Sequence, residues 1–114
     1  MTIFNGAFPV LPGQEAAARA FAKEVLSSRR QGFEGLQRRS GVRRETWSIQ
    51  ESPMGSLMLV WFEAPDIEAS FADLSTSNDE FSVWFRSSVK DLTGIDLAEP
   101  AEGAPEVVLE WNAG

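Results

Sequence analysis

Four polar side chains alternate along one stretch of the chain, and their types suit the recognition of a small ligand. Arg44, Thr46, Ser48 and Gln50 stand two residues apart, so in a strand they share one face. An arginine can fix an anionic group through paired hydrogen bonds, and the other polar groups can orient the rest of a ligand. The alternative is a solvated or water-filled part of a subunit interface, which needs the same residue types. The sequence leaves both interpretations open.

Two tryptophans stand close to this polar row. Trp47 lies within the same stretch and points to its other side, and Trp61 lies in the next apolar stretch. If the two stretches form neighbouring strands, the two indoles would flank one cavity. The alternative is a packing role, because tryptophan is common in cores and interfaces. On the functional interpretation, the candidate ligand-binding residues are Arg44, Trp47, Ser48 and Trp61.

The residue types that the chain lacks exclude several kinds of chemistry. It contains no cysteine, histidine or tyrosine. This removes thiolate nucleophiles, thiolate metal sites, the commonest general base and the usual proximal haem ligand. We therefore expect no metal and no cofactor. Glu63 could serve as a general base if it is desolvated, and the alternative is an exposed carboxylate at the end of a strand.

Charge and hydropathy limit the partners. The net charge of −7 argues against general nucleic-acid binding. No run approaches the roughly 18 apolar residues of a membrane span, and the first residues lack the pattern of a signal peptide. We expect a soluble, cytoplasmic protein. The basic residues concentrate in residues 1–44, which indicates a solvated helix face or, alternatively, an anion site or a contact with the acidic half of another subunit.

The elements that must position these residues follow from apolar spacing and from turn signals. At 114 residues, the chain should form a single domain over 1–114. Residues 56–63 are mostly apolar without strict alternation, which is typical of a strand that is buried on both faces. Asp66 is a plausible helix cap. We predict strands over 3–10, 42–51, 56–63 and 106–112, and helices over 14–39, 66–75 and 80–93.

This order, strand-helix-strand-strand-helix pair-strand, predicts an α+β fold of the ferredoxin-like βαββαβ type. Its four-stranded antiparallel sheet would have helices on one face only. Leu59 and Val60, like Val108 and Leu109, place apolar side chains on both faces of their strands. An uncovered apolar face of that size usually marks an interaction site. We therefore expect a homodimer in which the open sheet faces of two copies pack together.

The element order, the Pro12-Gly13 turn and the run Phe81-x-x-Trp84-Phe85-x-x-x-Val89-x-x-Leu92-Thr93-Gly94-Ile95-Asp96-Leu97 resemble the dimeric α/β-barrel superfamily. That superfamily includes proteins similar to antibiotic-biosynthesis monooxygenases and stress-responsive barrel proteins. The resemblance implies a dimeric barrel with a pocket between sheet and helices. In the cofactor-independent monooxygenases of the superfamily, the substrate is a polycyclic aromatic that gives an electron to oxygen. Asn5 and Trp61 are the residue types that the resemblance makes candidates for catalysis.

Two functions are consistent with these observations. The first is the binding of a small apolar or aromatic metabolite in a pocket between sheet and helices, without catalysis. The second is a cofactor-independent monooxygenase or isomerase that acts on an aromatic or polyketide-like substrate. A hydrogen-bonding side chain that faces a cavity would favour the enzyme, whereas a cavity filled by aromatic side chains would favour a simpler role.

Overall fold

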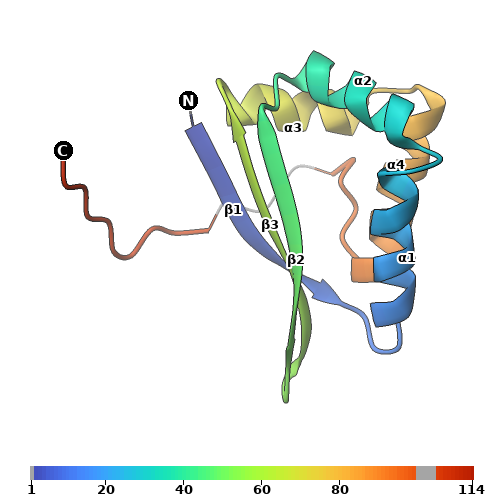
Figure 1. The fold of residues 1–114 in the computed structure, drawn as a ribbon, viewed down its shortest axis with the longest axis horizontal. Coiled ribbons are helices and arrows are strands. Elements are labelled where there is room, and N and C mark those ends of the chain that lie inside the picture. The colour runs from blue at the N-terminus through green and yellow to red at the C-terminus, as the bar shows by residue number, and fades with distance from the viewer. Residues whose placement is uncertain (1, 100–104) are drawn as a thin grey trace.

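The computed structural model describes residues 2–99 and 105–114 of the chain. Their order is strand, two helices, two strands and two helices (Figure 1). The elements are β1 (Thr2–Val10), α1 (Glu15–Val25), α2 (Arg30–Ser40), β2 (Arg44–Ser52), β3 (Gly55–Ala64), α3 (Ile67–Thr76) and α4 (Glu80–Thr93).

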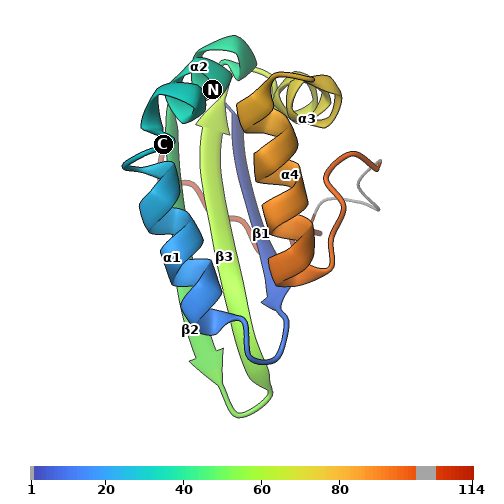
Figure 2. The same ribbon diagram turned by 90° about the vertical axis from the view of Figure 1, so that its right-hand side faces the viewer.

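The sheet is antiparallel, with the strand order β1-β3-β2 among the described residues. In the part of the chain that the structure describes, all four helices lie on one side of the sheet and none lies on the other (Figures 1 and 2). The fold is therefore α+β with helices on a single face, as predicted. The fourth strand predicted over 106–112 is not formed, since residues 105–114 adopt neither helix nor strand. These residues favour a strand by composition, but a strand also needs a neighbour, and this segment runs away from the sheet (Figure 1).

The long helix predicted over 14–39 is in fact two helices that run in different directions (Figure 2). The break occupies residues 26–29, where the Ser27 hydroxyl donates to the Lys23 carbonyl at 2.7 Å and the Arg29 amide to the Glu24 carbonyl at 2.9 Å. The Arg29 side chain continues across the break to Glu24 at 3.3 Å and stacks over Trp84, 4.4 Å from the ring centroid. The break lets α1 follow the strands while α2 crosses the end of the sheet. Residues 26–29 contain no proline or glycine that would indicate a helix break.

The other helices begin and end where the sequence indicated. The Asp66 side chain accepts from the Ala69 amide at 3.1 Å and caps α3, and Asp79 accepts from the Ser82 amide at 3.2 Å and caps α4. Helix α4 ends at Gly94, whose φ of 78° suits a residue without a side chain. No helix of the described residues has the length and apolar character that crossing a membrane requires.

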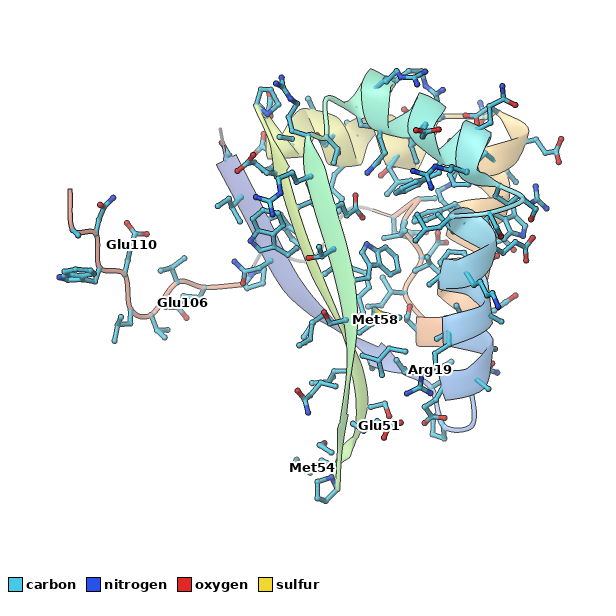
Figure 3. The ribbon with its side chains drawn as sticks, in the orientation of Figure 1. Arg19, Glu51, Met54, Met58, Glu106 and Glu110 are labelled. Atoms are coloured by element: carbon cyan, nitrogen blue, oxygen red, sulfur yellow. The ribbon has the colours of Figure 1, made fainter. Side chains whose placement is uncertain are left out.

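The core fills the space between the sheet and the helices. Alternate residues of each strand point into it, and the exposed alternates point away, as strand geometry requires. An ion pair of 3.1 Å between Arg19 and Glu51 joins α1 to the far end of β2 at the rim of this layer (Figure 3). The buried apolar residues are Val10, Ala18, Phe21, Val25, Leu36, Met58, Val60, Phe62, Ala64, Phe81, Phe85, Val89 and Leu92.

Candidate functional site

Most of the residues predicted to bind a ligand gather on the uncovered face of the sheet. Asn5 on β1 and Thr46 on β2 both stand opposite Trp61 of the central strand β3. The Arg44 guanidinium carbon lies 5.3 Å from the centroid of the Trp61 ring, within the range of a cation–π contact. Ser48 follows Arg44 and Thr46 along the same face of β2. Four of the five candidates, Asn5, Arg44, Ser48 and Trp61, are thus brought onto one surface.

Trp47 lies on the other face, so the prediction that Trp47 and Trp61 flank one cavity is wrong. The register pairs Trp47 with Val60 and Trp61 with Thr46. Side chains of directly opposite residues share a face, and successive residues alternate between faces. Because Val60 is buried beneath the helices, Trp47 is directed there as well, while Trp61 is directed away. A pleated sheet cannot place the two indoles on one side in this register.

The uncovered face has a shallow hollow of about 550 Å3 around Trp61. Its walls combine an amide, two hydroxyl groups and apolar side chains, which is a mixture suited to a partner with both kinds of surface. Residue Pro105, at the start of the final segment, closes one side. The lining residues are Asn5, Gly6, Ala7, Thr46, Ser48, Leu59, Val60, Trp61 and Pro105.

A second cavity, of about 50 Å3, lies between the sheet and the helices. Aromatic and aliphatic side chains make up most of its wall, and its few polar groups come from α2, β2 and α3. This is the place where the resemblance implied a pocket. The residues around it are Phe4, Phe8, Phe33, Leu36, Gln37, Ser40, Val42, Glu45, Trp47, Val60, Phe62, Ser70, Phe71, Leu74, Phe85 and Leu97.

Glu45 is the acidic residue in the wall of this cavity. Strand β2 directs it toward the helices, two residues before Trp47 on the same face. Its Oε1 accepts a hydrogen bond of 2.9 Å from the Gln37 side-chain amide on α2, and its Oε2 accepts one from the Trp47 indole N–H. The residue is half-buried, and its carboxyl group is held between these two donors beside an aromatic wall.

Burial raises the pKa of the Glu45 carboxyl above its ordinary value. Loss of water disfavours the charged form, and this outweighs the hydrogen bonds from Gln37 and Trp47, which favour it. A carboxyl group with a raised pKa can donate or accept a proton closer to neutral pH than an exposed glutamate can. Glu45 is therefore a candidate functional residue, because it lines the cavity and burial raises its pKa.

The sequence analysis missed Glu45, although a signal for it existed. The alternation that placed Arg44, Thr46 and Ser48 on one face also placed Glu45 beside Trp47 on the other. A carboxylate on the strand face that also carries Trp47 and Ile49 is an indication that it faces a core. Within the described residues, no group of three or more acidic side chains is arranged to hold a metal ion.

The chain was compared with known protein families, with curated proteins and with solved structures, and no match was found in any of the three.

Proposed function

We propose that the cavity between the sheet and the helices binds a small apolar or aromatic molecule whose polar group bonds to Glu45. The observation that carries the proposal is one carboxyl group with a raised pKa in an otherwise mostly apolar wall. Binding sites for small molecules typically combine an apolar lining with a few placed polar groups. A phenol or another weak acid would donate its proton to Glu45 in a hydrogen bond and lay its ring against the aromatic side chains.

The size of the cavity limits the ligand. Its volume of about 50 Å3 is enough for a few water molecules, each of which needs roughly 10–15 Å3. A single aromatic ring needs on the order of 150 Å3, so side chains must move to admit it. Phe4 is one lining side chain that could move, since it is only half-buried, with its ring over Gly6 and against Phe71 at 4.9 Å between centroids. The proposed ligand is therefore a compound with one ring.

A comparison of phenol with toluene tests this assignment. Both rings should shift the amide and indole resonances of residues around the cavity in two-dimensional NMR spectra, and phenol should bind several-fold more tightly. Glu45→Gln should remove most of this preference and retain toluene binding. Phe4→Ala should strengthen the binding of both ligands because it enlarges the cavity. If neither ligand shifts these resonances in the wild-type protein or in Phe4→Ala, the cavity is not a binding site.

The raised pKa of Glu45 specifically favours a second candidate, a cofactor-independent isomerase. In that reaction Glu45 takes a proton from the carbon between a carbonyl group and a carbon–carbon double bond, and it returns the proton to the far carbon of the resulting dienolate, so that the double bond moves next to the carbonyl. Exchange of these protons for deuterium in heavy water, followed by NMR for simple aryl ketones, measures the first half of the reaction. The exchange should fall at least a hundredfold in Glu45→Gln. Equal rates in the two proteins would leave ligand binding as the only function of the cavity.

The ferredoxin-like arrangement, and with it the resemblance to dimeric α/β barrels, is also a proposal. The order β1-β3-β2, with the helices on one face, supports it. One element is missing from the sheet of the described residues, namely a fourth strand.

A further inference from the structure

Residues 95–99 follow α4 and contribute to the wall of the cavity between the sheet and the helices. They form neither helix nor strand, and they turn back beside α4 toward α3 (Figures 1 and 2). Leu97 is half-buried, packs against the core and lines the cavity, as do Phe71 and Leu74 of α3 and Phe4 of β1. Leu97 is therefore a wall residue that no helix or strand holds in place.

A hydrogen bond from α3 reaches this segment. The Ser75 hydroxyl lies 2.8 Å from the Leu97 carbonyl oxygen, and it also lies 2.8 Å from the Phe71 carbonyl oxygen one turn earlier in its own helix. A hydroxyl group has one hydrogen, so it donates fully to only one of these carbonyls at a time. Serine within a helix often donates to the carbonyl four residues before it. The bond to Leu97 can therefore break without leaving the hydroxyl unsatisfied.

Hydrogen bonds within the segment give it a shape of its own. The Asp96 side chain accepts from the Ala98 amide at 2.9 Å, and the Asp96 carbonyl accepts from the Glu99 amide at 3.1 Å. Aspartate stabilises turns in this way by bonding to the backbone two residues further on. These bonds join near neighbours in the sequence, so they stay intact when the segment moves relative to α3.

The segment is joined to α4 at a glycine. Gly94 ends the helix with a φ of 78°, and beyond it the Ile95 amide donates to the Thr93 hydroxyl at 3.1 Å. Lys90 of α4 pairs with Asp96 at 3.8 Å, but its side chain is 61% exposed, and ion pairs at the surface contribute little. Glycine accepts backbone angles that other residues avoid, so Gly94 is suited to act as a hinge.

We propose that residues 95–99 gate the cavity, with Leu97 as the closing side chain and Ser75 as the latch. Opening breaks the bond from the Ser75 hydroxyl to the Leu97 carbonyl, turns that hydroxyl to Phe71, and withdraws the Leu97 side chain from the wall. It gives a molecule with one ring a route into a cavity of about 50 Å3. The gate rests on the proposed function for the ligand that passes, whereas water passes whether or not a ligand binds.

Hydrogen exchange measures the gate without a ligand. The Trp47 indole N–H donates to Glu45 in the cavity wall, so its exchange in heavy water requires that water reaches it. Ser75→Ala removes the latch, and this hydrogen should exchange about fivefold faster, the factor expected for one hydrogen bond. Thr76→Ala is the matched control and should change nothing. The exposed Thr76 hydroxyl makes the same bond within α3, to the Ala72 carbonyl at 2.7 Å, and none to the segment.

Toluene measures the gate with a ligand. In Ser75→Ala, its rates of entry and exit from NMR line shapes should both rise about fivefold, and its dissociation constant should stay within about twofold. The reason is that the latch holds the closed state in the free and in the bound protein. Thr76→Ala should leave both rates unchanged. Leu97→Ala removes the closing side chain itself and should speed toluene entry and Trp47 exchange more than Ser75→Ala does.

Two results would overturn the proposal. The first is equal exchange of the Trp47 indole hydrogen in Ser75→Ala and Thr76→Ala, because water would then reach the cavity by another route. The second is toluene that binds with the same rates in these two variants, which would leave the binding function intact without a gate. If toluene does not bind and Trp47 exchange still depends on Ser75, the gate is supported and the proposed function fails.

Discussion

The two faces of strand β3 have similar compositions and different environments. Met58, Val60 and Phe62 point toward the helices and are 3%, 5% and 6% exposed. Leu57 and Leu59 point to the other side and are 39% and 38% exposed. One apolar set is thus packed by the chain itself, and the other is left without a cover of its own. The two sides of this strand therefore differ in packing, and in the described residues only the helix side is closed.

The polar groups of the two faces also differ in their exposure to water. On the uncovered face, Arg44, Thr46 and Ser48 are exposed beside Trp61 and retain their hydration. On the covered face, the Glu45 carboxyl has lost much of its water and is held by Gln37 and Trp47. The first arrangement suits a subunit contact, and the second suits a small ligand. Of the candidate residues that sequence reasoning named, only Trp47 lies on the second face.

The largest expected effect on stability comes from comparing one substitution on each side of β3. Phe62→Ala should destabilise the protein by about 3–5 kcal/mol, because it leaves a cavity among packed aromatic rings. Leu59→Ala should cost less than about 0.5 kcal/mol at low protein concentration, where its side chain is near solvent. Urea unfolding of both variants measures this.

Protein concentration sharpens the same comparison. If a second copy covers the open face, the cost of Leu59→Ala should grow as the wild-type protein is studied at higher concentration. The cost of Phe62→Ala should not depend on concentration in this way. Equal costs for the two variants at low concentration would contradict the difference between the faces.

Two glycines of α2 test how tightly the covered side is packed. A Cβ on Gly32 would lie 2.7 Å from Phe81 Cβ, so Gly32→Ala should destabilise by about 1–3 kcal/mol. Gly35 is one turn further along, where a Cβ would meet only the end of the Arg39 side chain at 3.6 Å. Gly35→Ala should stabilise the helix by about 0.5–1 kcal/mol. Thermal unfolding of the pair would refute close packing of α2 on α4 if both substitutions were stabilising.

The smallest effect is the pH dependence that Glu45 contributes. Because burial raises its pKa in the folded protein, its contribution to stability is fully present below the ordinary glutamate pKa and is lost as the pH rises through the raised value. Glu45→Gln cannot ionise and should lack this loss. The free energy of unfolding of the variant, relative to wild type, should therefore increase by on the order of 1 kcal/mol between pH 4 and pH 8.

Asp79 provides a control, because its pKa is shifted in the opposite direction to that of Glu45. Desolvation acts to raise its pKa, but hydrogen bonds from Ser82 and the charge of Arg39 outweigh it and lower the pKa. Its contribution is present above the ordinary aspartate pKa and is lost as the pH falls, so Asp79→Asn should matter most near neutral pH. Urea titrations from pH 3 to pH 8 distinguish the two residues. A flat difference between wild type and Glu45→Gln would show that Glu45 is not desolvated.

Most of the local structure could be predicted from the sequence. The strands on either side of the hairpin, the α4 helix from Glu80 to Thr93 and the cap at Asp66 all follow from spacing and from turn residues. The break within residues 26–29 could not, because it depends on how α1 and α2 pack on elements distant in the sequence, as the contact of Arg29 with Trp84 illustrates. The last strand was predicted from composition alone, and composition does not supply a neighbour.

Part of the candidate site could also be predicted from the sequence, and part could not. Alternation along β2 was sufficient to group Arg44 and Ser48 on one face, whereas placing Trp61 on that face needed the pairing of Trp61 with Thr46. The separation of Trp47 from Trp61 needed the strand register, which pairs Trp47 with Val60. Glu45 needed more than register, since its pKa depends on burial by helices from other parts of the chain and on Gln37 of α2.

The sequence by itself determined which segments are helical or extended and which side chains share a face, because these depend on neighbours a few positions away. Tertiary structure alone decided which face the helices cover, where the long helix breaks, that Glu45 is desolvated, and that residues 105–114 lie apart from the sheet. Each of these depends on contacts between distant segments. Their free energies come from burial and desolvation, which a one-dimensional pattern of residue types does not specify.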